Sequence, residues 1–189
     1  YKEQVLKKRL AYSTVSQVSY ILFGLSVLNT DGMVGALSHF VFHSVVKNCL
    51  FLVAGVIIYK TGRKTVKELK VIGKEMPVTM WCFTLVSITL VGIPPTSGFV
   101  SKWYLATGSL KDKMGVYTWL GPVVLLLSAM LTAGYLLPIS IQSFFPGEEC
   151  KKTGYQKREP NLLMLLPMLF FTAAAVLFGM FPGSFLSFL

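Results

Sequence analysis

The sequence is poor in charge, above all in acidic residues. Charged residues make up 14% of its 189 positions, whereas ordinary soluble domains carry roughly a quarter. Only 8 residues are Asp or Glu, against 18 Lys or Arg. Together with 53% hydrophobic residues and a mean hydropathy of +0.63, this scarcity excludes an ordinary soluble domain and predicts an integral membrane protein.

Cysteines are also scarce, which excludes further classes. Cys49, Cys82 and Cys150 are too few and too scattered for a disulfide framework or a zinc site. The sequence has neither the cysteine cluster that holds an iron–sulfur centre nor the glycine-rich strand–turn–helix fingerprint of dinucleotide binding. We therefore expect no cofactor and no catalytic redox centre in this chain.

Long apolar stretches are abundant, and five are long enough to cross about 30 Å of hydrocarbon as helices. In lipid, backbone polar groups must be satisfied within the spanning element, which favours helices. We predict an all-α integral membrane fold in which residues 1–189 form a single transmembrane domain. The five predicted transmembrane helices cover about 11–29, 33–59, 77–110, 117–143 and 161–185.

The third stretch is interrupted by "GIPPTSG", Gly92 to Gly98. Pro94 and Pro95 remove two backbone donors and clash with the preceding turn, and Pro94 disfavours helical geometry at the residue before it. We predict a discontinuous helix with an unwound stretch between two halves, and a simple proline kink is the alternative. In transporters such breaks commonly mark the ion path.

The basic residues sort by side if the five helices alternate in direction. Fourteen of the 18 fall on the side of the N-terminus and of loops 60–76 and 144–160: Lys2, Lys7, Lys8, Arg9, Lys60, Arg63, Lys64, Lys67, Lys70, Lys74, Lys151, Lys152, Lys157 and Arg158. The opposite side has only Lys111 and Lys113. The positive-inside rule places the basic side and the N-terminus in the cytoplasm, so the net charge needs no nucleic-acid partner.

Two lysines, Lys47 and Lys102, fall inside predicted helices. A charge at the bilayer centre costs about 2.5 to more than 10 kcal/mol, and all eight acidic residues lie in loops or at helix ends. Because burial disfavours the charged form of an amine, such a lysine can both hold and release a proton, as a proton relay requires. The alternative is a structural lysine that pairs with another subunit or with backbone carbonyls.

His39, His43 and Lys47 are spaced i, i+4, i+8, which places them on one helical face, roughly one turn apart. Neutral histidine donates and accepts at once, so such a row can pass protons. Water or the hydroxyls of Ser38 and Ser44 would bridge the gaps. A histidine pair can also hold a metal or haem, but no third ligand lies nearby and we expect no metal.

Three stretches carry a family resemblance: "KKRLAYSTVSQVSYILFGLS" (Lys7 to Ser26), "HFVFHSVVKNCLFLVAG" (His39 to Gly55) and "GIPPTSGFVSKWYL" (Gly92 to Leu105). The chain resembles the antiporter-like membrane subunits of respiratory complex I and their relatives in Mrp-type antiporters and membrane-bound hydrogenases. The resemblance implies a C-terminal fragment, about helices ten to fourteen, without the N-terminal part. It also implies a central hydrophilic axis at Lys47, His43 and His39, which Lys102 on the broken helix connects to the far aqueous side.

Three functions remain open on these residues. The first is a non-redox, proton-translocating subunit of a complex I-like NADH:quinone oxidoreductase or membrane-bound hydrogenase, coupled to electron transport. The second is a Mrp-type sodium/proton antiporter subunit, and the third is a truncated, non-conducting scaffold. Each implies other membrane subunits and the lipid bilayer as partners, and the first two imply protons or sodium as the transported ion. The expected location is a prokaryotic inner membrane, in which the chain is a multi-pass protein.

Overall fold

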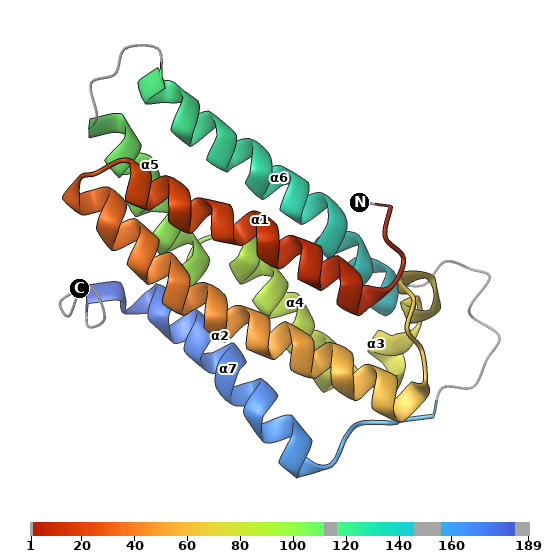
Figure 1. Ribbon diagram of the computed structural model, residues 1–189. Helices are drawn as coiled ribbons and strands as arrows, with labels where there is room; N and C mark the ends of the chain where they lie inside the picture. Colours follow the sequence, from red (N-terminus) through yellow and green to blue (C-terminus); the bar gives the residue numbers. More distant parts are fainter. Residues whose placement is uncertain (1, 112–116, 146–155, 184–189) are drawn as a thin grey trace.

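The computed structural model describes residues 2–111, 117–145 and 156–183, which fold into a bundle of helices (Figure 1). In chain order the elements are α1 (Leu6–Ser26), α2 (Thr30–Thr61), the 3-10 helix η1 (Val66–Leu69), α3 (Ile72–Glu75), α4 (Pro77–Val91), α5 (Ser97–Lys111), α6 (Tyr117–Phe144) and α7 (Leu162–Met180). Within the described residues the only pairing of extended segments is an isolated bridge between Val5 and Thr65. The predicted all-helical fold is confirmed.

The helix ends differ from the predicted ranges, most clearly at α1. This helix begins at Leu6 and ends at Ser26 rather than covering 11–29. Lysine and arginine are good helix formers, so the basic run joins the helix instead of preceding it. The side chain of Asn29 accepts a hydrogen bond from the backbone N–H of Gly32 and caps α2, so this residue belongs to the next helix.

The remaining predicted ranges fit the helices more closely. Helix α2 extends the predicted range 33–59 at both ends, and α6 extends 117–143 by one residue. The predicted loop 60–76 contains η1 and α3. Helix α7 begins one residue inside the range 161–185, and the last two residues of that range lie outside the described part of the chain.

Three helices, α2, α6 and α7, are long and apolar enough to cross a membrane, and α4 is a shorter apolar helix. Helix α1 is long enough but carries three basic residues and several hydroxyl side chains. Helices α4 and α5 have 15 residues each, which is about 22 Å and too short to cross alone. The described residues are those of a membrane protein, while the number of five spans stays a prediction.

The chain leaves helical geometry over residues 92–96, between α4 and α5. Gly92 ends α4 with a φ of 91°, a conformation that a side chain disfavours. The peptide bond between Pro94 and Pro95 is cis. A Cβ on Gly98 would overlap the carbonyl oxygen of Thr89, so glycine lets the first turn of α5 pack directly on α4. The helix is therefore broken into two halves, rather than kinked.

Helix α2 lies at the centre of the bundle, in contact with α1, α4, α5 and α7 (Figure 1). Glycines allow the close approach of its neighbours. A Cβ on Gly35 would lie 2.8 Å from the backbone nitrogen of Leu105 in α5, and one on Gly32 would lie 2.7 Å from the carbonyl oxygen of Gly24 in α1. This packing brings the residues of α1 and α5 against the middle of α2.

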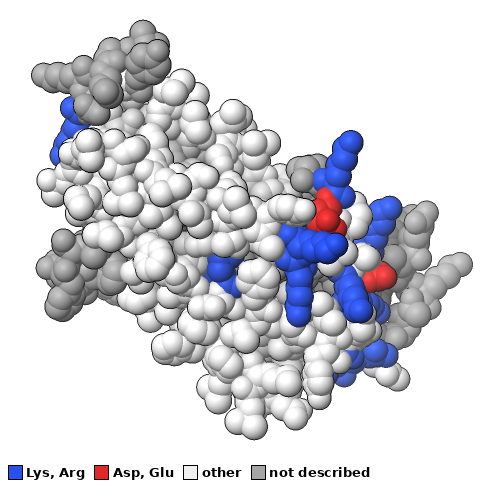
Figure 2. All heavy atoms as spheres, in the orientation of Figure 1, with Lys and Arg blue, Asp and Glu red and all other residues white. Residues whose placement is uncertain are grey.

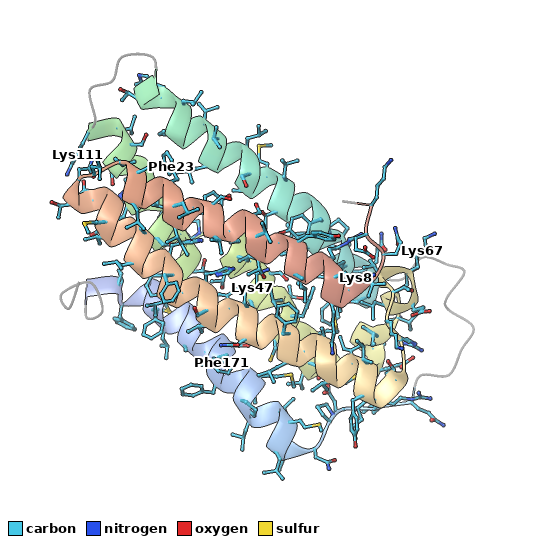
Figure 3. All side chains as sticks on the ribbon, viewed as in Figure 1. Lys8, Phe23, Lys47, Lys67, Lys111 and Phe171 are labelled. Atoms are coloured by element: carbon cyan, nitrogen blue, oxygen red, sulfur yellow. The ribbon has the colours of Figure 1, made fainter. Side chains whose placement is uncertain are left out.

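Basic side chains gather at the end of the bundle where the N-terminus and α3 lie (Figure 2). Lys8 and Lys67 are at this end and Lys111 is at the opposite one (Figure 3). At the basic end, the Leu6 N–H donates a hydrogen bond to the Lys64 carbonyl at 3.0 Å, which connects the start of α1 to the segment after α2. The N-terminal run and the 60–76 linker thus share one end, as the charge pattern predicts. Lys113, Lys151 and Lys152 lie outside the described residues.

Candidate functional site

Lys47 is buried in α2, between the two ends of the bundle (Figure 3). Its Nζ donates to the carbonyl oxygen of Leu10 at 3.0 Å and to Ser13 Oγ at 2.8 Å, both on α1. Ser13 Oγ in turn lies 2.5 Å from the hydroxyl of Tyr135 on α6. The Lys47 amine is thus bound by one carbonyl and one hydroxyl, and the Ser13 hydroxyl is in turn hydrogen-bonded to the Tyr135 hydroxyl.

The two histidines form a column on the same face of α2. The rings of His39 and His43 stack with their centroids 5.9 Å apart and their planes 14° apart. Tyr20 of α1 meets the His39 ring edge-on, at a centroid distance of 5.3 Å. His39 and His43 retain only 3% and 8% of their exposure, so both imidazoles lie inside the bundle, one turn apart, as their spacing predicts.

The hydrogen bond that leads away from this column comes from α5. His39 Nδ1 lies 2.9 Å from Ser101 Oγ, and the Ser101 hydroxyl can donate to the Gly98 carbonyl at 3.2 Å. The expectation that Ser38 and Ser44 bridge the column is wrong. Their hydroxyls donate to carbonyls of their own helix, because the carbonyl one turn earlier is the nearest acceptor for a helical serine.

Lys102 lies in α5 and reaches back to the end of α4. Its Nζ donates to the carbonyl oxygens of Leu90 and Val91 at 2.8 and 2.7 Å. The last carbonyls of a helix have no partner within it and carry partial negative charge, so a cation is favoured there. The same Nζ lies 5.4 Å from the ring centroid of Tyr20, where the ring face also attracts a cation. Lys102 therefore joins the two halves of the broken helix.

Neither buried lysine has a carboxylate partner among the residues that the structure describes. Two ion pairs join Arg63 to Glu75 and Lys111 to Asp31, near the two ends of the bundle. Both buried amines are bound by neutral oxygens, which solvate a proton without fixing a permanent charge. A purely structural lysine would adopt the same arrangement.

A small cavity lies against both imidazoles. It has a volume of about 10 Å³ and is lined by His39, Phe42, His43, Val46, Thr89, Leu90 and Gly98. That volume is about what one water molecule needs. The Nε2 atoms of His39 and His43 are buried without a hydrogen-bond partner among the described residues. The cavity therefore adjoins imidazoles that retain hydrogen-bonding capacity.

Together these groups form a buried polar row: Lys47, His43, His39, Ser101 and Lys102. The row runs along α2 and crosses to α5 just beyond the unwound segment. A lysine that carries a proton stands at each end, and the two histidines and the serine between them can both donate and accept one. The break itself, with Gly92, Pro94, Pro95 and Gly98, lies next to its Lys102 end.

Sequence reasoning missed the contribution of α1. Ser13, Gln17, Tyr20 and Gly24 lie on its buried face, and Ser13 and Tyr20 touch the buried polar row. Their spacing of four, three and four residues is typical of one helical face. A polar face on an otherwise apolar span was the available signal, but it was overlooked because serine, glutamine and tyrosine carry no charge.

The profile of the family described as "NADH:quinone oxidoreductase/Mrp antiporter, TM" matches residues 2–132. The chain belongs to this family. Among the family's curated members, NADH-quinone oxidoreductase subunit N of Desulforudis audaxviator is 35% identical over 96% of the chain, which covers 38% of that protein. A Na(+)/H(+) antiporter subunit of Bacillus subtilis is 33% identical over 92% of the chain, which covers 34% of that protein.

A solved structure has the same fold. A chain of respiratory complex I from Thermus thermophilus with bound NADH matches 97% of this chain with a TM-score of 0.83 and 23% sequence identity. The match covers 37% of that chain. This antiporter-like family member therefore spans little more than a third of the length of these relatives.

Proposed function

We propose that the chain forms part of a proton-translocating subunit in a membrane complex, with protons moving along the buried polar row. The observation that carries the proposal is that Lys47, His43, His39 and Lys102 follow one another in space through the interior of an apolar bundle. Burial of lone charges in lipid is costly, and a hydrophobic residue would serve packing better. Buried amines and imidazoles are explained if they exchange protons during transport.

In the proposed path, Lys47 and Lys102 bind the proton, and the two histidines connect them. A proton on Lys47 passes to His43 and His39, through the small cavity beside them, and then through Ser101 towards Lys102. Protonating one of these groups raises the free-energy cost of protonating its neighbour, so the groups titrate as a coupled set. Lys102 holds its proton against the α4 carbonyls, and the unwound segment beside it gives the route towards the far aqueous side.

The proposed membrane arrangement has five spans, of which α4 and α5 together make the discontinuous third. The basic end then faces the cytoplasm of a prokaryotic cell, with the N-terminus on that side. Each proposed span rests on one helix or one helix pair: α1, α2, the pair α4 and α5, α6 and α7. Addition of a membrane-impermeant amine reagent from each side would test this orientation at Lys8 and Lys111.

The rest of the unit would come from outside this stretch. Because the chain covers 38% of the Desulforudis audaxviator protein and 34% of the Bacillus subtilis protein, we propose that it corresponds to their C-terminal part, about helices ten to fourteen. The uptake half of the path, the electron-transfer centres and the neighbouring membrane subunits belong to other segments or chains. This chain then needs no cofactor of its own.

A sodium/proton antiporter subunit is the second candidate function. The 33% identity to the Na(+)/H(+) antiporter subunit of Bacillus subtilis supports it, and the same buried residues would serve it. Transport by the intact complex separates the two, because an antiporter exchanges protons for sodium and a redox-driven pump moves protons without sodium. A non-conducting scaffold predicts that neither buried lysine matters for transport.

The experiment replaces each buried lysine in the complete complex and measures proton movement in membrane vesicles with a pH-sensitive dye. Lys47→Met and Lys102→Met keep side-chain length but remove the proton-binding nitrogen, so we expect proton movement per assembled complex to fall at least about tenfold. Lys67→Met, at an exposed lysine of the basic end, is the matched control. Native transport in both buried variants would leave the scaffold as the better explanation.

A further inference from the structure

Gln17 is the most deeply buried polar side chain of α1, with 0% of its surface exposed. Its Nε2 and Oε1 atoms both lack a hydrogen-bond partner among the residues that the structure describes. A buried amide without partners costs free energy, and native proteins almost always satisfy such groups. An apolar residue would fill this position at lower cost, so the amide requires an explanation.

The register of α1 against α2 indicates which residue of α2 lies beside the Gln17 amide. The two helices are antiparallel, and Ser13 bonds to Lys47 while Tyr20 contacts the ring of His39. Gln17 lies between Ser13 and Tyr20 on the same face of α1. On α2, His43 lies between Lys47 and His39, and so the packing places Gln17 level with His43.

Two polar faces therefore meet along the interface of α1 and α2. One consists of Ser13, Gln17 and Tyr20, and the other of Lys47, His43 and His39. The outer two pairs are in contact. Atoms without a hydrogen-bond partner among the described residues occur in the middle pair, at both amide atoms of Gln17 and at Nε2 of His43, and also at the Tyr20 hydroxyl and His39 Nε2. Of these six residues, Gln17 is the one with two side-chain atoms that lack a partner within the described residues.

We propose that Gln17 is a positioning residue for proton transfer between Lys47 and His43. A side-chain amide offers an acceptor at Oε1 and donors at Nε2, so a rotation of the amide plane serves either state of the imidazole. Oε1 accepts from a protonated His43 nitrogen, and Nε2–H donates to an unprotonated one, directly or through one water. The proton itself moves between the lysine and the histidine, and Gln17 neither gains nor loses one.

The titratable groups around His43 are its neighbours on three helices. Lys47 and His39 lie one turn away on α2, Tyr20 lies on α1, and Lys102 of α5 places its amine over the Tyr20 ring. Helix α4 contributes only Thr89 and Leu90 to the cavity beside the imidazoles, among the described residues. Gln17, which the packing places level with His43, does not itself titrate.

This inference rests on the proposed function and is tested in the complete complex by proton movement in vesicles over a range of pH. Gln17→Met keeps the size but removes the amide. We expect proton movement to slow roughly three- to tenfold, the factor that corresponds to one hydrogen bond, with a displaced pH profile. Gln17→Asn keeps an amide and should recover part of the rate. Ser140→Ala is the control. It removes a buried hydroxyl that, like the Gln17 amide, lacks a partner among the described residues, and it should move protons at the native rate.

Gln17→Glu is the second variant, and it is used in case the methionine variant assembles poorly. It is isosteric and polar, but its carboxylate would hold a proton beside Lys47 and slow transport in a fully assembled complex. Native rates and pH profiles in both Gln17→Met and Gln17→Glu, with transport abolished in Lys47→Met, would overturn the role of Gln17 alone. Native transport in Lys47→Met would overturn the proposed function as well.

Discussion

Replacing Lys102 by methionine should loosen the helix break, because the lysine amine is the donor for two carbonyls at the end of α4. Those carbonyls, of Leu90 and Val91, accept from Nζ at 2.8 and 2.7 Å. A buried acceptor left without a donor costs about 1–3 kcal/mol, so the pair costs roughly 2–6 kcal/mol. Relief from burying an ammonium offsets part of this, and we expect a net local loss of about 2 kcal/mol.

Hydrogen exchange of the backbone amides around the break measures this loss. A change of about 2 kcal/mol corresponds to roughly 30-fold faster exchange, and it should appear at Gly92 and Ile93, whose N–H groups donate to the Ile88 carbonyl. Lys111→Met on the same helix is the control. It removes a surface ion pair whose lysine side chain is 67% exposed, and such pairs contribute at most about 1 kcal/mol.

Lys102→Arg separates the structural part from transport. Arginine keeps several donors for the α4 carbonyls, so exchange at the break should stay within a few-fold of the native rate. It does not release its proton in proteins, so transport should still be lost. Exchange at Gly92 that is unchanged in the methionine variant would refute the reasoning, since the amine would then not be holding the break together.

Two further predictions concern the backbone and the linker. Gly98→Ala should destabilise the protein by about 1–3 kcal/mol in a thermal melt, because its Cβ would overlap the Thr89 carbonyl oxygen. Gly55→Ala, where a Cβ would meet nothing within 4 Å, should instead stabilise α2 by about 0.5–1 kcal/mol, and equal effects would contradict the packing at the break. Hydrogen bonds from the backbone N–H groups of Thr65 and Lys64 lower the pKa of the Glu68 carboxyl. The stabilisation from this carboxylate is therefore complete above its ordinary pKa of about 4.3 and is lost as the pH falls through the lower folded value. The amide NMR signal of Thr65 should report a midpoint below about 4.3, and a midpoint at or above that value would contradict this.

The fold could be predicted where one physical signal dominates. Apolar length predicted the helices, and the two consecutive prolines after Gly92 predicted the break, because they remove two backbone donors and clash with the preceding turn. The end of α1 was predicted less well. Apolar length does not tell that Lys7 and Lys8 continue a helix, or that Asn29 caps the next one.

The candidate site was predictable in part for the same reason. Lys47, His39 and His43 carry charge or titrate, so their presence in an apolar stretch is visible in the sequence. Gln17 and Ser101 are neutral, and their roles depend on which helix packs against which face of α2. That information comes from the three-dimensional packing, and a single sequence supplies only the spacing along each helix.

The most direct test of proton exchange at the centre of the bundle is Lys47→Arg in the complete complex. Arginine keeps a positive charge at this position and can still donate to the Leu10 carbonyl and Ser13, but it holds its proton permanently. If Lys47 takes up and releases protons, vesicles with this variant will move protons no faster than those with Lys47→Met, although the complex assembles normally. Native proton movement in the arginine variant would contradict the claim, because a fixed charge would then suffice.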